Sequence, residues 1–98
     1  MNIKVFRHGL PIAEIDGILR DSNIVDGRLV WQRFPDDIAS VLAEYSSALE
    51  DLSFHDWDAF RETIQAFDLE ARGEMINGQV EDLQVYENGA SLVKIKGK

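Results

Sequence analysis

The sequence predicts one α+β domain over residues 1–98, in which a small antiparallel sheet of hairpins carries a central pair of helices on one face. Three observations predict this class. Residues 1–34 and 74–98 combine β-branched and aromatic residues with turn dipeptides, a pattern typical of hairpins. Residues 35–71 instead repeat apolar residues every three or four positions, as amphipathic helices do. No linker or internal repeat divides the chain, so the expected order is β-β-β-α-α-β-β-β.

The first strands and their turns are predicted from residue type. Ile3 to Phe6 has the composition of a strand, and Ile12 to Arg20 is a weaker strand pattern interrupted at Asp16-Gly17. Two further dipeptides, Asp26-Gly27 and Asn77-Gly78, favour two-residue type I′ turns, because both central positions of such a turn need a positive φ. Each is therefore expected at the tip of a hairpin.

The two helices are predicted from their apolar stripes and their ends. Pro35 suits the first helical position, and the acids that follow it favour the positive end of the helix dipole. The first stripe consists of Ile38, Val41, Leu42, Tyr45, Leu49 and Leu52. Ser53 is the expected N-cap of the second helix, which Gly73 would end. The second stripe consists of Trp57, Phe60, Ile64, Phe67 and Ala71.

The final hairpin allows two registers, and charge and hydropathy favour one of them. A three-residue loop at 87–89, with its glycine left-handed, places Leu83 opposite Val93 and Asp82 opposite Lys94. That register keeps one face apolar and sets opposite charges against each other. The alternating lysines that follow indicate an edge strand whose charges discourage association between sheets.

Composition excludes several classes of protein. The chain has 18 acidic and 10 basic residues, a formal net charge of −8 and no Cys. Zinc–thiolate sites, iron–sulfur clusters, thiol nucleophiles and disulfides are therefore excluded. The negative charge argues against direct nucleic-acid binding, which needs a cationic surface. No apolar run is long enough to span a membrane, no secretory signal is evident, and we expect a cytoplasmic protein.

The negative charge is concentrated in the helical segment. Residues 35–70 carry a net charge of −9, whereas residues 1–34 carry a net charge of +1 and residues 71–98 a net charge of zero. Acids spaced by seven residues line one flank of the first helix, and others surround an aromatic residue at the start of the second. These charges either form a solvated face or dock a cationic partner. The candidate partner-binding residues are Asp37, Glu44, Asp51, Asp56, Trp57, Asp58 and Glu62.

No motif points to catalysis or to a cofactor. His8 and His55 are the only histidines, and neither has a second histidine at metal-ligand spacing. Nucleophile elbows and phosphate-binding glycine loops do not occur in the sequence. We therefore expect a protein that is not an enzyme and that holds neither a metal nor a cofactor.

The function that best fits these features is a small acidic binding protein. Its most concrete form is a bacterial stoichiometric inhibitor, an immunity protein or antitoxin, that neutralises a basic partner such as a toxin nuclease. Two alternatives stay open. One is a homo-oligomeric structural or assembly domain that associates through sheet edges or helix faces, and the other is a small enzyme or ligand-binding domain. The sequence allows a monomer or a homodimer.

Overall fold

The computed structural model describes residues 1–51 and 57–96, which form six strands and two helices. Their order is the predicted one, three strands, two helices and three strands. The elements are β1 (Asn2–Arg7), β2 (Leu10–Asp21), β3 (Ile24–Gln32), α1 (Asp36–Asp51), α2 (Trp57–Ala66), β4 (Leu69–Arg72), β5 (Asn77–Val85) and β6 (Ala90–Ile95).

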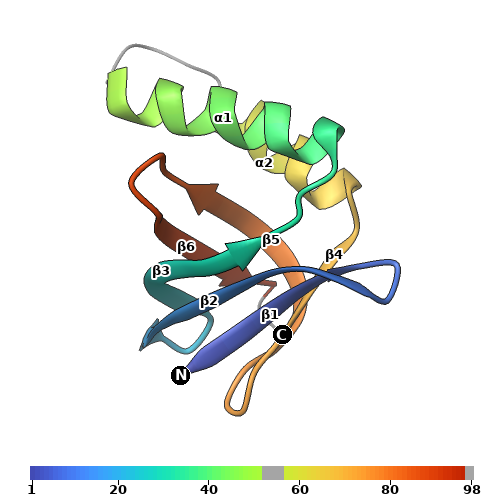
Figure 1. Cartoon of the computed structure of the whole chain (residues 1–98), viewed down its shortest axis with the longest axis vertical. Coiled ribbons are helices and arrows are strands. Elements are labelled where there is room, and N and C mark those ends of the chain that lie inside the picture. Colours follow the sequence, from blue (N-terminus) through green and yellow to red (C-terminus); the bar gives the residue numbers. More distant parts are fainter. Residues whose placement is uncertain (52–56, 97–98) are drawn as a thin grey trace.

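The strands close into an antiparallel barrel in the order β1-β2-β3-β6-β5-β4, with β4 also pairing with β1. Both helices lie together beyond one end of the strands and contact β5 (Figure 1). The predicted α+β class, an open sheet with helices on one face, is therefore wrong. The predicted edge strand is also wrong, because β6 pairs with both β3 and β5. Local patterns indicated the strands but not the long-range pairing that joins the two ends of the sheet.

The two dipeptides predicted as turns lie inside strands. Asp26-Gly27 belongs to β3, where Gly27 faces Gly17 of β2, and the turn between these strands is at residues 22–23. A Cβ on Gly17 would lie 2.6 Å from the carbonyl oxygen of Asp26, and one on Gly27 would overlap the carbonyl oxygen of Asp16. Glycine is needed here because the two backbones approach closely, not because the chain turns. Asn77-Gly78 likewise opens β5.

The register predicted for the last hairpin is confirmed. Leu83 faces Val93, Asp82 faces Lys94, and Gly89 in the connecting loop has a φ of 91°. The environment of Asp82, however, differs from the expected one. This residue is only 5% exposed, and its carboxylate bonds to a helix rather than serving as a solvated partner for Lys94.

The first helix agrees with its predicted stripe as far as Leu49, Leu52 lies outside the described residues, and the second helix is shorter than predicted. In α1 the buried side chains are Ile38, Leu42, Tyr45 and Ala48. α2 ends at Ala66, and Asp68, with a φ of 57°, leads into β4. The predicted continuation to Ala71 and the cap at Gly73 are wrong, because Leu69 and Ala71 are buried with the period of two of a strand. The predicted cap at Ser53 lies outside the described residues.

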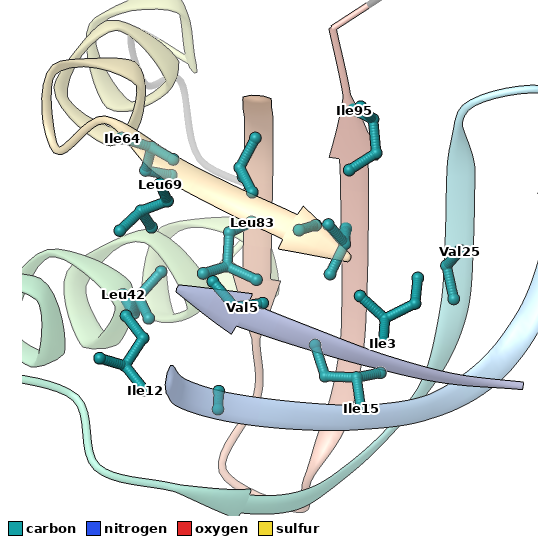
Figure 2. Close-up of a cluster of buried hydrophobic side chains, with 14 of the residues drawn as sticks. Ile3, Val5, Ile12, Ile15, Val25, Leu42, Ile64, Leu69, Leu83 and Ile95 are labelled. Carbon is teal, nitrogen blue, oxygen red and sulfur yellow. The ribbon is translucent and has the colours of Figure 1, made fainter. Parts of the chain in front are cut away.

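The core fills the barrel and continues to the helices. Side chains from β1, β2, β3, β5 and β6 converge inside the barrel, as Figure 2 shows for Ile3, Ile15, Val25, Leu83 and Ile95. Leu42 of α1 and Ile64 of α2 belong to the same buried cluster. One apolar core therefore holds the helices against the barrel, which fixes the surface that they present.

A buried polar contact also joins α1 to the barrel. The Tyr45 hydroxyl donates to Asp82 Oδ2 at 3.1 Å, and Gln84 Nε2 donates to the same oxygen at 3.1 Å. Arg61 of α2 brings its Nε within 4.0 Å of this oxygen. Asp82 Oδ1 is buried without a hydrogen-bond partner among the described residues, so the carboxylate depends on the donors at Oδ2.

Replacing Gly27 tests the close approach of β2 and β3. Gly27→Ala should lower the free energy of unfolding by about 3 kcal/mol, because the new methyl group forces two backbones apart. Val30→Ala, at an exposed position of the same strand, should change it by less than about 1 kcal/mol. Urea denaturation measures both; equal stability of Gly27→Ala and the wild type would contradict the packing described here.

Replacing Tyr45 tests the polar contact between α1 and β5. Tyr45→Phe should destabilise the protein by about 1–3 kcal/mol at pH 7, because a buried carboxylate loses a donor. Tyr86→Phe is the matched control, since that half-buried hydroxyl donates, among the described residues, only to Gln84 Oε1, at 3.2 Å. An equal loss of stability in the two variants, measured by urea denaturation, would argue against a special role for Tyr45.

The same contact predicts a loss of stability in alkaline solution. Burial, followed by the negative charge and hydrogen bond of Asp82, raises the pKa of Tyr45 from 10.0 to about 12. The unfolded chain therefore loses this proton first, so the contribution of Tyr45 is complete below pH 10 and disappears as the pH rises to about 12. Unfolding experiments between pH 8 and pH 12 should show a smaller decline for Tyr45→Phe than for the wild type.

Candidate partner-binding site

The acidic residues predicted to bind a partner lie on the outside of the two helices. Asp37, Glu44 and Asp51 are exposed on α1, and Asp58 and Glu62 are exposed on α2. Trp57, at the start of α2, is half-buried. Asp56 lies outside the described residues. The structure thus places these acids at one end of the molecule, beyond the barrel (Figure 1).

Asp37 is engaged by a residue of the barrel. Arg7 of β1 donates from Nη1 to Oδ1 at 3.0 Å and from Nη2 to Oδ2 at 2.9 Å. The hydrogen bonds from Arg7 lower the pKa of Asp37 and raise that of Arg7. The guanidinium carbon of Arg7 also lies 5.6 Å from the centre of the Phe67 ring. Asp37 therefore fastens the start of α1 to the barrel and adds less to an open acidic field than the sequence suggested.

On α2, Asp58 has a basic partner and Glu62 does not. Arg61 Nη1 lies 2.7 Å from Asp58 Oδ1, one turn along the helix. Within residues 1–51 and 57–96, no hydrogen bond or ion pair engages either Glu62 or Glu44. The two glutamates are thus available to an external cation.

Glu44 and Asp51 lie together beside α2. They line a shallow groove of about 470 Å³ with Phe60, and we call it the inter-helix groove; its other lining residues are Ala43, Ser47 and Ala48. The Phe60 ring stacks on Tyr45 with centroids 4.9 Å apart, and the Trp57 ring lies 6.4 Å from Tyr45. The groove therefore combines two carboxylates with the ring of Phe60, which is held in place by its stacking on Tyr45.

A second hollow lies on the other flank of α1 and was not predicted. It measures about 480 Å³, and we call it the α1–barrel cavity. Its apolar lining comes from Leu29, Phe34, Leu42 and Val85, and its small residues are Ala39, Ala43, Ser46 and Ser47. Gln32, Glu50, Tyr86 and Glu87 complete the lining. One signal was available in the sequence, since the small residues and Glu50 recur every three or four positions along α1.

His8 lies at a third, smaller hollow, whose lining includes no residue of either helix. The φ values of His8 and Gly9, 51° and 82°, are those of a two-residue hairpin turn. Asp68 and Glu70 line the same hollow of about 240 Å³, and Glu70 bonds to Arg72 at 2.6 Å. No group of three or more His, Cys, Asp or Glu in the described part of the chain can hold a metal ion. His55 lies outside that part.

Comparisons with known proteins do not add to this description. No protein-family model, curated protein or solved structure matches the chain. Among the described residues, neither helix is long and apolar enough to cross a membrane.

Proposed function

We propose that this chain is a non-enzymatic binding protein that recognises a basic protein through the outer surface of α1 and α2. The observation that carries the proposal is the inter-helix groove, where Glu44 and Asp51 flank the ring of Phe60. Negative charge beside an aromatic ring suits lysine and arginine side chains, which combine a cation with an apolar stem. The most concrete form of this function is a stoichiometric inhibitor, such as an immunity protein or antitoxin against a nuclease.

The charge distribution supports the same proposal. Basic proteins that bind nucleic acid carry cationic grooves, and an acidic surface both speeds encounter with such a groove and occupies the place of phosphates. The helical segment 35–70 has one basic residue, Arg61, against ten acids. Since Arg61 is directed to Asp58 and Asp82, it leaves Glu44 and Glu62 uncompensated. We place this activity in the cytoplasm, because a chain without Cys suits a reducing compartment.

The closed barrel bears on the alternative of a homo-oligomeric assembly domain. Each of the six described strands pairs with a neighbour on both sides over at least part of its length, so none offers a wholly unpaired edge for association. The route through sheet edges therefore has less support than self-association through the helix faces. We favour binding of a basic partner, since like charges on the helices oppose contact between two copies.

Charge reversal tests the proposed surface. A tagged chain should capture a basic protein from a lysate of its source, and that protein, once identified and purified, provides the ligand for kinetic measurements. Glu44→Lys/Glu62→Lys should slow association about tenfold at 0.15 M salt and change dissociation much less, because these charges act mainly during encounter. Raising the salt concentration should reduce the difference between the variant and the wild type.

The matched control reverses two exposed acids of the barrel. Asp21→Lys/Glu74→Lys changes the net charge by the same amount but leaves the helices unaltered. It should slow association by less than about threefold. Equal effects of the two double variants would show that only net charge matters, and an association that does not respond to either would contradict the proposed surface.

A further inference from the structure

The α1–barrel cavity has an apolar base and an aromatic wall. Leu29 and Phe34 contribute from β3 and the segment after it, Leu42 from α1, and Val85 and Tyr86 from the end of β5. Leu42 is 4% exposed, whereas the others are half-buried and stay accessible from the cavity. A volume of about 480 Å³ lies within the range of roughly 300–1,000 Å³ typical of ligand pockets. The hollow can therefore accept a compact group with apolar faces.

The charge of the cavity has a single sign. Of its lining residues, which all belong to the described part of the chain, only Glu50 and Glu87 are charged, and both are exposed. Neither has a hydrogen bond or ion pair with the described residues. Arg28 donates from Nη2 to the carbonyl oxygen of Asn88 at 2.7 Å rather than to either carboxylate. Two uncompensated carboxylates thus stand on different elements beside an apolar base.

Tyr86 lies beside this charge. Its hydroxyl donates to Gln84 Oε1 at 3.2 Å, which links it to the network around Asp82 and Tyr45. Burial, and then the negative charge of Glu50, raises the pKa of Tyr86. A cation held in the cavity would face both the carboxylates and an aromatic ring.

We propose that the α1–barrel cavity binds the guanidinium group of an arginine side chain presented by the basic partner protein. A guanidinium is planar and weakly hydrated, so it can lie on an apolar and aromatic surface while it donates hydrogen bonds to carboxylates at its edge. A lysine ammonium is strongly hydrated and fits such a base less well. This inference rests on the proposed function, because the partner surface that carries the arginine is the basic one argued above.

The position of the cavity suits a partner that sits across α1. Ala43 and Ser47 line both the α1–barrel cavity and the inter-helix groove, so only small side chains separate the two hollows. A partner can therefore reach both at once without a bulky ridge between them. Glu50 and Glu87 would hold the arginine on one flank of α1, and Glu44 would attract a cation on the other.

Three aromatic probes of one shape test the cavity without the partner. Benzamidine carries the amidinium that stands for a guanidinium, benzamide is its neutral counterpart, and benzoate is the anion. Nuclear magnetic resonance titrations of the ¹⁵N-labelled chain should show benzamidine binding at least about tenfold more tightly than benzamide, and benzoate not binding. The shifted amides should include those of Ala43, Ser46 and Glu87.

Single substitutions locate the binding. Glu50→Gln and Glu87→Gln should each weaken benzamidine binding about threefold, as expected for exposed charges. Glu74→Gln, the matched change at an exposed acid of the barrel that lines neither hollow of α1, should leave it unchanged. Ala39→Leu should abolish it by filling the cavity, since Ala39 is an exposed lining residue that can be enlarged without disturbing the core. Unchanged far-ultraviolet circular dichroism would confirm that the variants fold.

The outcomes separate this inference from the proposed function. Equal affinity for benzamidine and benzamide, no shifts at the cavity, or equal loss in Glu74→Gln and Glu50→Gln would overturn the arginine site. If those results accompany slower partner association in Glu44→Lys/Glu62→Lys, the proposed function stands and the cavity has no part in it. If benzamidine binds as expected but charge reversal does not affect the partner, the cavity binds cations and the proposed docking surface is wrong.

Discussion

The pairing of β1 with β4 is the constraint on which the rest of the structure depends. β4 has only four residues, yet it bonds to β1 on one side and to β5 on the other. It thereby joins the strands before the helices to those after them and turns a sheet into a barrel. Closure gives every described strand a neighbour on both sides and encloses the inward-facing apolar side chains. It also brings α2, which leads into β4, back over the end of the barrel.

The helices are held on that end by apolar packing and by a buried carboxylate. Ile38, Leu42 and Ile64 extend the barrel core, and this burial supplies most of the attachment. The contact of Asp82 with Tyr45 fixes the orientation of α1 on the barrel, because a buried carboxylate is costly unless its donors are correctly placed. Arg7, which binds Asp37, fastens the start of α1 to the barrel. Three attachments thus set the orientation of α1, and with it both hollows along its flanks.

The acidic residues of the helices serve two different purposes. Asp37 and Asp58 bind arginines of this chain, so their charges are largely structural. Glu44, Glu50 and Glu62 have no hydrogen bond or ion pair among the described residues, so their charges are not compensated by pairing there. That division explains why total charge is a poor guide to a docking surface: the relevant quantity is the charge left after internal pairing.

Much of the local structure followed from the sequence alone. The order of elements, the buried face of α1, the register of β5 against β6 and the acidic character of the helices all depend on residues close together in the chain, whose spacing determines which face they share. The misplaced turns share one cause, since a glycine after Asp or Asn suits a type I′ turn and equally suits a place where backbones approach each other. Tertiary structure placed both glycines inside strands, Gly27 where two backbones approach each other and Gly78 against the Ile95 side chain.

Only the tertiary structure determined barrel closure, the end of α2 and the α1–barrel cavity. Closure depends on strands far apart in the sequence, and pairing at that distance leaves no periodic signal in either strand. The apolar spacing that predicted a longer second helix was misleading, because Leu69 and Ala71 are buried in β4, the strand that closes the barrel. Glu50 and Glu87 became neighbours across a cavity only when α1 was placed against the β5–β6 hairpin. The sequence by itself thus determined the faces and charges of the elements, and the fold decided which of those faces meet, because contact between distant segments depends on the packing of the whole chain.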